Sequence, residues 1–103
     1  MKRLNSALLA AALSAASMSA QASLELVDKS ACLNCHAVDK KMIGPAFKDI
    51  AAKYKDRKDA SAYLADKLTK GSTGVWGQIP MPGMPQLAPA DVKTMVEWVL
   101  KQP

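Results

Sequence analysis

Both cysteines and the only histidine of this 103-residue chain stand within five consecutive positions, 32 to 36, in the order Cys-Leu-Asn-Cys-His. This spacing constrains the fold most, because C-x-x-C-H is the attachment signature of c-type haem. Two thiols on one helical turn, Cys32 and Cys35, can reach the two vinyl groups on one edge of a porphyrin. His36 then lies under the iron. We therefore predict one covalently attached haem c with His36 as an axial ligand.

Three other interpretations of this segment are less favoured. A zinc site needs four protein ligands as a rule, and adjacent Cys35 and His36 would have difficulty binding one tetrahedral ion together with Cys32. A thioredoxin-like dithiol belongs in a βαβ context, and the sequence has no strand pattern. A structural disulfide would close a very small loop, which removes little entropy from the unfolded chain. It would also leave His36 without a role.

The N-terminus has the pattern of a secretory signal. Lys2 and Arg3 precede a short apolar run, and the triplet Ala-Gln-Ala that ends at Ala22 has the small-x-small form of a cleavage site. We predict a removed signal peptide over residues 1–22, a single domain over 23–103 and a periplasmic location. The run is too short to span a bilayer comfortably, so an uncleaved membrane anchor is the less favoured alternative and we expect no stable membrane insertion.

The charge of the chain is mildly basic. It has 14 Lys and Arg against 9 Asp and Glu, and loss of Lys2 and Arg3 with the signal would leave an excess of about three positive charges. Because the lysines of the mature part alternate with aspartates, a solvated surface is favoured over a nucleic-acid-binding patch. We expect a monomer that binds no nucleic acid.

Apolar residues recur at helical spacing in four segments. Leu24, Val27 and Ala31 predict a helix that runs into the cysteine motif. The pattern predicts three more helices: one with Phe47, Ile50, Ala51 and Tyr54 on its buried face; one that Asp59 caps and Gly71 ends; and one that starts at Pro89 and buries Val92, Met95, Val96 and Val99. No strand pattern is visible. The sequence predicts an all-α fold of three to five short helices wrapped around the haem.

A long loop without regular structure is expected over residues 71–89, which hold four of the five glycines and four of the six prolines. The loop is too rich in apolar residues for a disordered linker, so we expect it to pack against the haem. With no second histidine, a methionine thioether is the soft ligand that suits the other side of the iron. Met42 is close to His36 in sequence and Met95 belongs to a helix face, which leaves Met81 and Met84 on the loop.

The sequence resembles the small bacterial monohaem class I cytochromes c. The resemblance covers Leu24 to Lys101 and rests on four motifs in combination, "CLNCH", "KMIGPAFKDIAAKY", "GVWGQIPMP" and "MVEWVL". It implies that Met81 is the distal iron ligand and that the Pro45 carbonyl accepts a hydrogen bond from His36. It also implies that Trp76 donates to a haem propionate, with Lys67 near a propionate. The chain departs from the family in having Met84 where relatives often have asparagine, so Met84 is the rival ligand.

The resemblance implies a soluble periplasmic electron carrier that turns over no substrate. Its expected partners are redox proteins: a terminal oxidase, a nitrite reductase or a cytochrome bc-type donor. We expect Met42, Ile43 and Ile79 to frame an exposed haem edge, with Lys40, Lys41 and Lys48 around it. The alternative is a haem c protein with an open sixth coordination site, acting as a gas sensor or peroxidase. A haem-free disulfide or zinc module is a third possibility.

Overall fold

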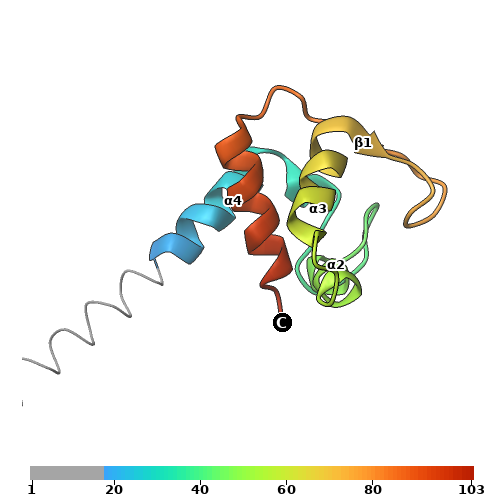
Figure 1. Ribbon diagram of the computed structural model, residues 1–103, viewed down its shortest axis with the longest axis horizontal. Coiled ribbons are helices and arrows are strands. Elements are labelled where there is room, and N and C mark those ends of the chain that lie inside the picture. Colours follow the sequence, from blue (N-terminus) through green and yellow to red (C-terminus); the bar gives the residue numbers. More distant parts are fainter. Residues whose placement is uncertain (1–17) are drawn as a thin grey trace, which may run out of the picture.

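The structure is a computed structural model that describes residues 18–103, and it is mostly helical (Figure 1). After a helix over residues 18–29, the chain forms a short 3-10 helix and three α-helices, with a pair of two-residue strands between the last two. In chain order these elements are η1 (Cys32–Asn34), α2 (Phe47–Tyr54), α3 (Ala60–Lys70), β1 (Gly71–Ser72), β2 (Met81–Pro82) and α4 (Pro89–Leu100). The predicted all-α class is confirmed.

The core lies where α2 and α3 pack against α4. The predicted buried face of α2 is confirmed, since Phe47, Ile50, Ala51 and Tyr54 are all buried. On α4 the residues Val92, Met95 and Val96 are buried, whereas Val99 is only partly so. The helical spacing of apolar residues therefore predicted which faces point inward, because a surface helix must bury its apolar stripe.

The helix over 18–29 contributes less to the core than its sequence pattern predicted. Val27 is 1% exposed, but Leu24 is 42% exposed. Ala31 lies beyond the end of the helix with a positive φ of 65°, in the left-handed region that commonly ends a helix. The predicted helix is therefore present, but it ends before Ala31, and the chain turns there into η1.

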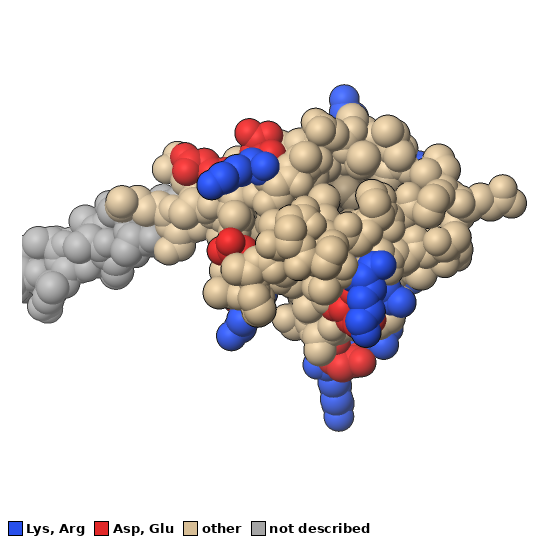
Figure 2. Space-filling model, turned by 90° about the horizontal axis from the view of Figure 1, so that it is seen from above, with Lys and Arg blue, Asp and Glu red and all other residues tan. Residues whose placement is uncertain are grey.

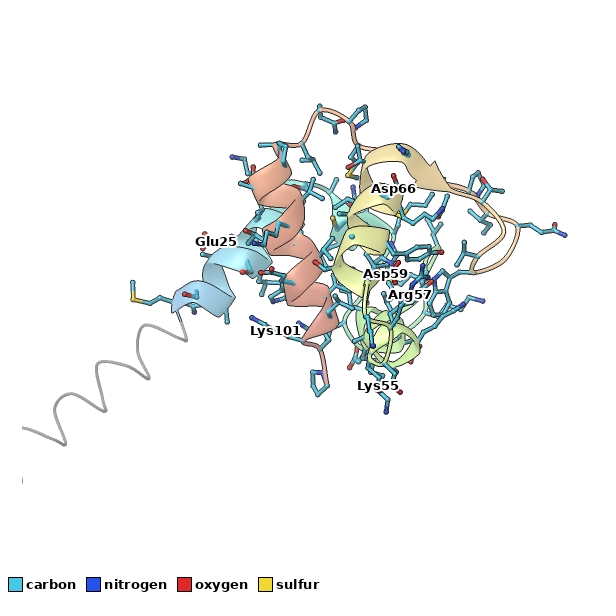
Figure 3. The ribbon with its side chains drawn as sticks, in the orientation of Figure 1. Glu25, Lys55, Arg57, Asp59, Asp66 and Lys101 are labelled. Atoms are coloured by element: carbon cyan, nitrogen blue, oxygen red, sulfur yellow. The ribbon has the colours of Figure 1, made fainter. Side chains whose placement is uncertain are left out.

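Two predictions about the loop and α3 need correction. Residues 71–89 do contain regular structure, because β1 pairs antiparallel with β2. A two-residue strand is too short to show an alternating pattern, so no sequence signal could have found it. Asp59 stands at the N-cap of α3 but makes no capping hydrogen bond. Its carboxylate accepts from the Arg57 guanidinium at 2.5 Å instead, as the side chains in Figure 3 show. Gly71 ends α3 as predicted, with φ 84°.

Charged side chains lie on the surface with both signs interspersed. Figure 2 shows lysines and arginines next to acidic residues on the face drawn there. Among the ion pairs, the Lys70 ammonium lies 2.8 Å from the Asp66 carboxylate one turn earlier in α3. Within residues 18–103 no helix is long and apolar enough to cross a membrane.

Candidate haem site

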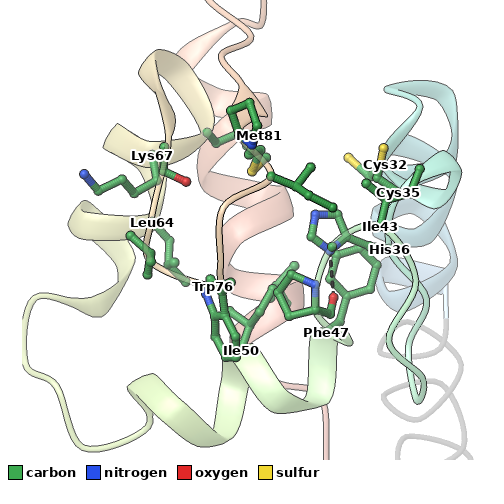
Figure 4. A pocket seen from close by; sticks show the side chains of 18 of the residues that line it. Cys32, Cys35, His36, Ile43, Phe47, Ile50, Leu64, Lys67, Trp76 and Met81 are labelled. Atoms are coloured by element: carbon green, nitrogen blue, oxygen red, sulfur yellow. Dashed lines mark hydrogen bonds between the residues drawn. The ribbon is translucent and has the colours of Figure 1, made fainter.

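η1 places the two thiols one helical turn apart at the wall of a cavity (Figure 4). The turn is closed by backbone hydrogen bonds, since the amides of Cys35 and His36 donate to the Cys32 carbonyl at 3.2 and 2.9 Å. Both cysteines are free thiols and partly buried. The segment therefore presents two thiols and an imidazole to one space, which is the arrangement expected from the C-x-x-C-H spacing.

The surroundings of Cys32 do not suit a reactive dithiol. Burial raises the pKa of its thiol above the ordinary value of 9.0, and the adjacent Cys35 adds to the rise, against the backbone hydrogen bond that lowers it. Redox-active pairs have a lowered pKa, because the thiolate is the attacking form. Within residues 18–103 no three His, Cys, Asp or Glu side chains gather in a way that could hold a metal ion. The raised pKa of Cys32 is therefore the opposite of what a redox-active pair requires.

His36 is 9% exposed and its ring is fixed on several sides. Its Nδ1 lies 2.7 Å from the Pro45 carbonyl oxygen, which can only accept, so Nδ1 carries the proton and Nε2 is left as a free lone pair. Phe47 stacks on the imidazole with ring centroids 5.1 Å apart, and Trp98 contacts Phe47 edge-on. A methyl group on Gly44 would collide with the imidazole. The ring is thus held in the tautomer that binds iron.

One cavity of about 320 Å³ brings the predicted site residues together. Its volume lies in the range of small-molecule sites. Its wall is mostly apolar and comes from η1, the segment after it, all three α-helices and the loop between β1 and β2. The six predicted cofactor-binding residues all line it: Cys32, Cys35, His36, Pro45, Trp76 and Met81. Thiols, an imidazole, a thioether and an apolar wall are the groups that a haem c requires, so the residues fit this cofactor.

The cavity separates the two rival methionines. Met81, on β2, lines it, whereas Met84 is not among its lining residues in the described part of the chain. Both methionines pack against the hydrophobic core, and Met84 also donates its backbone N–H to the Leu68 carbonyl at 2.8 Å. Met42 and Met95 also line the cavity, from the segment before α2 and from α4.

Aromatic and basic side chains gather around Trp76 and the neighbouring parts of α2 and α3. The Lys53 ammonium lies 4.5 Å from the centroid of the Trp76 ring, and Lys67 lies over Tyr63 at 5.3 Å. Burial raises the pKa of Tyr54, and Tyr63 adds to the rise. These cations give this side of the cavity a positive potential that suits carboxylate groups.

The three apolar residues expected at the haem edge line the same cavity and are exposed. Met42 is 41% exposed, Ile43 57% and Ile79 68%. Of the three lysines expected around them, Lys41 lines the cavity and the others, Lys40 and Lys48, do not. The three apolar residues predicted for the haem edge therefore lie at one cavity, and of the three predicted lysines only Lys41 lines it.

The sequence interpretation missed the immediate neighbours of His36. The sequence predicts Phe47 only as part of a helix face and gives Gly44 no role of its own, yet both lie against the imidazole. No local pattern identifies such contacts, because they depend on how the 36–45 segment folds back. The cluster around Trp76 was missed for the same reason.

Comparisons with known proteins agree with this geometry. The family model for cytochrome c matches residues 20–103. Cytochrome c-552 of Nitrosomonas europaea is 53% identical over 81 residues, which are 79% of this chain and 79% of the relative. Cytochrome c-551 of Pseudomonas denitrificans is 46% identical over 76 residues, covering 74% of this chain and 92% of the relative.

A solved structure has the same fold. The crystal structure of wild-type Nitrosomonas europaea cytochrome c552 superposes with a TM-score of 0.75 at 50% identity, covering 78% of this chain and 99% of that one. Fold, cavity and relatives thus agree. The chain belongs to the cytochrome c family as a small monohaem class I member; the cofactor of this family is haem c, and the two cysteines of the Cys-x-x-Cys-His segment fit its covalent attachment.

Proposed function

We propose that this protein is a periplasmic one-electron carrier whose haem iron is bound by His36 and Met81. The observation that carries the proposal is the meeting of two thiols, the His36 imidazole and the Met81 thioether at one apolar cavity. When bound, haem c supplies a one-electron couple. Cys32 and Cys35 would hold the group covalently, the apolar wall would shield it from water, and His36 and Met81 would ligate its iron.

The roles of the side chains follow from their chemistry. The Pro45 carbonyl accepts a hydrogen bond from the Nδ1–H group of His36. This bond orients the ring and makes Nε2 a better electron donor. The Met81 thioether is a soft, neutral ligand that favours the reduced state and raises the reduction potential. With both axial positions filled by side chains, small molecules have no open site, so a carrier is favoured over a gas sensor or peroxidase.

Two single substitutions test the ligand assignment. We expect a weak far-red absorption band of the oxidised protein, which arises from thioether-to-iron charge transfer. Met81→Ala should abolish it, whereas Met84→Ala should retain it because Met84 does not line the cavity. Fast, complete binding of carbon monoxide to the unsubstituted reduced protein would contradict saturated ligation and favour the open-site alternative. Loss of the band only in Met84→Ala would show that Met84 is the ligand.

The exposed frame of Met42, Ile43 and Ile79 is the proposed electron-transfer contact. Lys41 at this wall would attract acidic redox partners, such as a terminal oxidase, a nitrite reductase or a cytochrome bc-type donor. Lys41→Glu should slow electron exchange with an acidic partner protein at low salt, and high salt should remove the difference. The matched control is Lys101→Glu, which makes the same change in net charge outside the cavity wall. Equal rates in both variants would exclude this contact.

We further propose that residues 1–22 are removed on export. Residues 1–17 of this segment lie outside the described structure. Residues 18–22 are all exposed, and Val27 is the first buried residue, so cleavage after Ala22 leaves the core intact. After export from a host that attaches haem, the intact mass should equal residues 23–103 plus one haem. A mass that retains the first 22 residues would support a membrane anchor instead.

A further inference from the structure

The segment that carries Met81 is fastened to the C-terminal end of α3. We call residues 81–84 the methionine strap. In the strand pair, Gly71 lies opposite Pro82 and Ser72 opposite Met81. The amide of Met84 donates to the Leu68 carbonyl at 2.8 Å, so the strap is held at both of its ends. The position of Met81 therefore depends on where α3 stops.

Two glycines allow this close approach, one on each side of the contact. A methyl group on Gly71 would lie 2.6 Å from the Met81 carbonyl oxygen and 2.8 Å from the Gly83 nitrogen. A methyl group on Gly83 would lie 2.6 Å from the Thr69 carbonyl oxygen. All of these neighbours are backbone atoms, so none can rotate away as a side-chain end would. Any side chain at either glycine must push the strap and α3 apart.

We propose that Gly71 and Gly83 are positioning residues that hold the Met81 sulfur at the haem iron. The inference rests on the proposed function, in which Met81 is the distal ligand. A strap displaced from α3 carries the Met81 backbone with it, because a methyl group on Gly71 would press against the Met81 carbonyl itself. The two glycines thus determine the fraction of molecules in which the Met81 sulfur is bound to the iron.

Binding of an added ligand measures this fraction. Imidazole can bind the ferric iron only where the thioether has left, so its apparent affinity is proportional to the open fraction. Overpacking a contact between backbone segments costs enough to change such an equilibrium by about tenfold or more. We therefore expect imidazole to bind Gly83→Ala and Gly71→Ala at least about tenfold more tightly than the unsubstituted protein. The far-red band should weaken in parallel.

Gly74→Ala is the matched control. Gly74 has φ 83°, nearly the value of 84° at Gly71, and it lines the cavity, but a methyl group there meets no protein atom within 4 Å. Gly74→Ala therefore places a side chain at a similar positive φ without the contact to the strap, and its imidazole affinity should stay close to that of the unsubstituted protein. If Gly71→Ala and Gly83→Ala bind imidazole no more tightly than Gly74→Ala, the positioning role is wrong.

A milder pair of variants tests the same strap if the alanine variants do not fold. Met84→Pro removes the N–H that the Leu68 carbonyl accepts, while Met84→Ala keeps it. Met84→Pro alone should bind imidazole more tightly, by severalfold to about tenfold, the size expected for one hydrogen bond. Equal affinities in the two variants would contradict the inference.

Met81→Ala separates this inference from the function on which it rests. If Met81→Ala neither removes the far-red band nor raises imidazole affinity, the ligand assignment has failed. If Met81→Ala does both but the glycine variants behave like Gly74→Ala, the ligand assignment holds and only the positioning role is wrong. Denaturant unfolding of each variant shows whether a change in affinity merely follows a loss of global stability.

Discussion

Gly44→Ala is the substitution that tests most directly how the chain fixes its proximal histidine. A methyl group at Gly44 would overlap the His36 imidazole, with its carbon 2.8 Å from Nδ1 and 3.0 Å from Nε2. The ring cannot retreat freely, because Phe47 stacks on it with centroids 5.1 Å apart. The ring must therefore tilt or shift, and the 2.7 Å contact between Nδ1 and the Pro45 carbonyl oxygen must lengthen.

Two effects of known size follow. Overpacking of this kind lowers the free energy of unfolding by about 1–3 kcal/mol. The net contribution of a hydrogen bond to stability is about 0.5–1.5 kcal/mol. For a one-electron couple, a tenfold change in the equilibrium constant corresponds to a change of about 59 mV in the reduction potential. Weakening the bond from Nδ1 makes Nε2 a poorer electron donor to the iron, which favours the reduced state. We expect the reduction potential to rise by roughly 20–60 mV.

The assay combines a redox titration with guanidinium unfolding of the haem-loaded protein. Gly74→Ala serves as the control, because it also replaces a glycine of the cavity wall by alanine but meets no protein atom within 4 Å. It should lose some stability through its positive φ and leave the potential unchanged. A potential in Gly44→Ala equal to that of Gly74→Ala, with the Nδ1 proton signal of His36 unmoved, would refute the close packing of Gly44 against the ring.

Three further outcomes are expected. Phe47→Ala should lower the free energy of unfolding by about 3–5 kcal/mol in denaturant titration, because it empties a buried site between the histidine and Trp98. Burial raises the pKa of Tyr54 above its ordinary value of 10.0, so its contribution to stability is complete below pH 10 and is lost as the pH rises through the folded-state pKa. As the pH rises above 10, the melting temperature should fall less in Tyr54→Phe than in the unsubstituted protein. Asp66→Ala should leave the unfolding midpoint in the same titration nearly unchanged, since its partner Lys70 is exposed and solvent screens the pair.

The sequence alone was sufficient for the features that depend on local spacing. The C-x-x-C-H segment predicted haem c, and the family relation confirms this cofactor. Periodic apolar residues predicted the buried faces of α2 and α4, because a helix repeats its surface every 3.6 residues. The same reasoning failed at Leu24, which lies in the helix but is exposed, and at Ala31, which lies beyond the end of the helix.

Tertiary structure decided which groups meet across long separations in the chain. From residue types, Met81 and Met84 were equivalent candidates, and only the family resemblance separated them. The fold distinguishes them because β1 pairs with β2 and places Met81 at the cavity wall, whereas Met84, although it packs against the same core, does not line the cavity. Gly44, the Pro45 carbonyl and Phe47 surround His36 because the chain reverses after η1. Spacing along a sequence reports repeating local geometry, whereas these contacts depend on how separate elements pack around a common cavity.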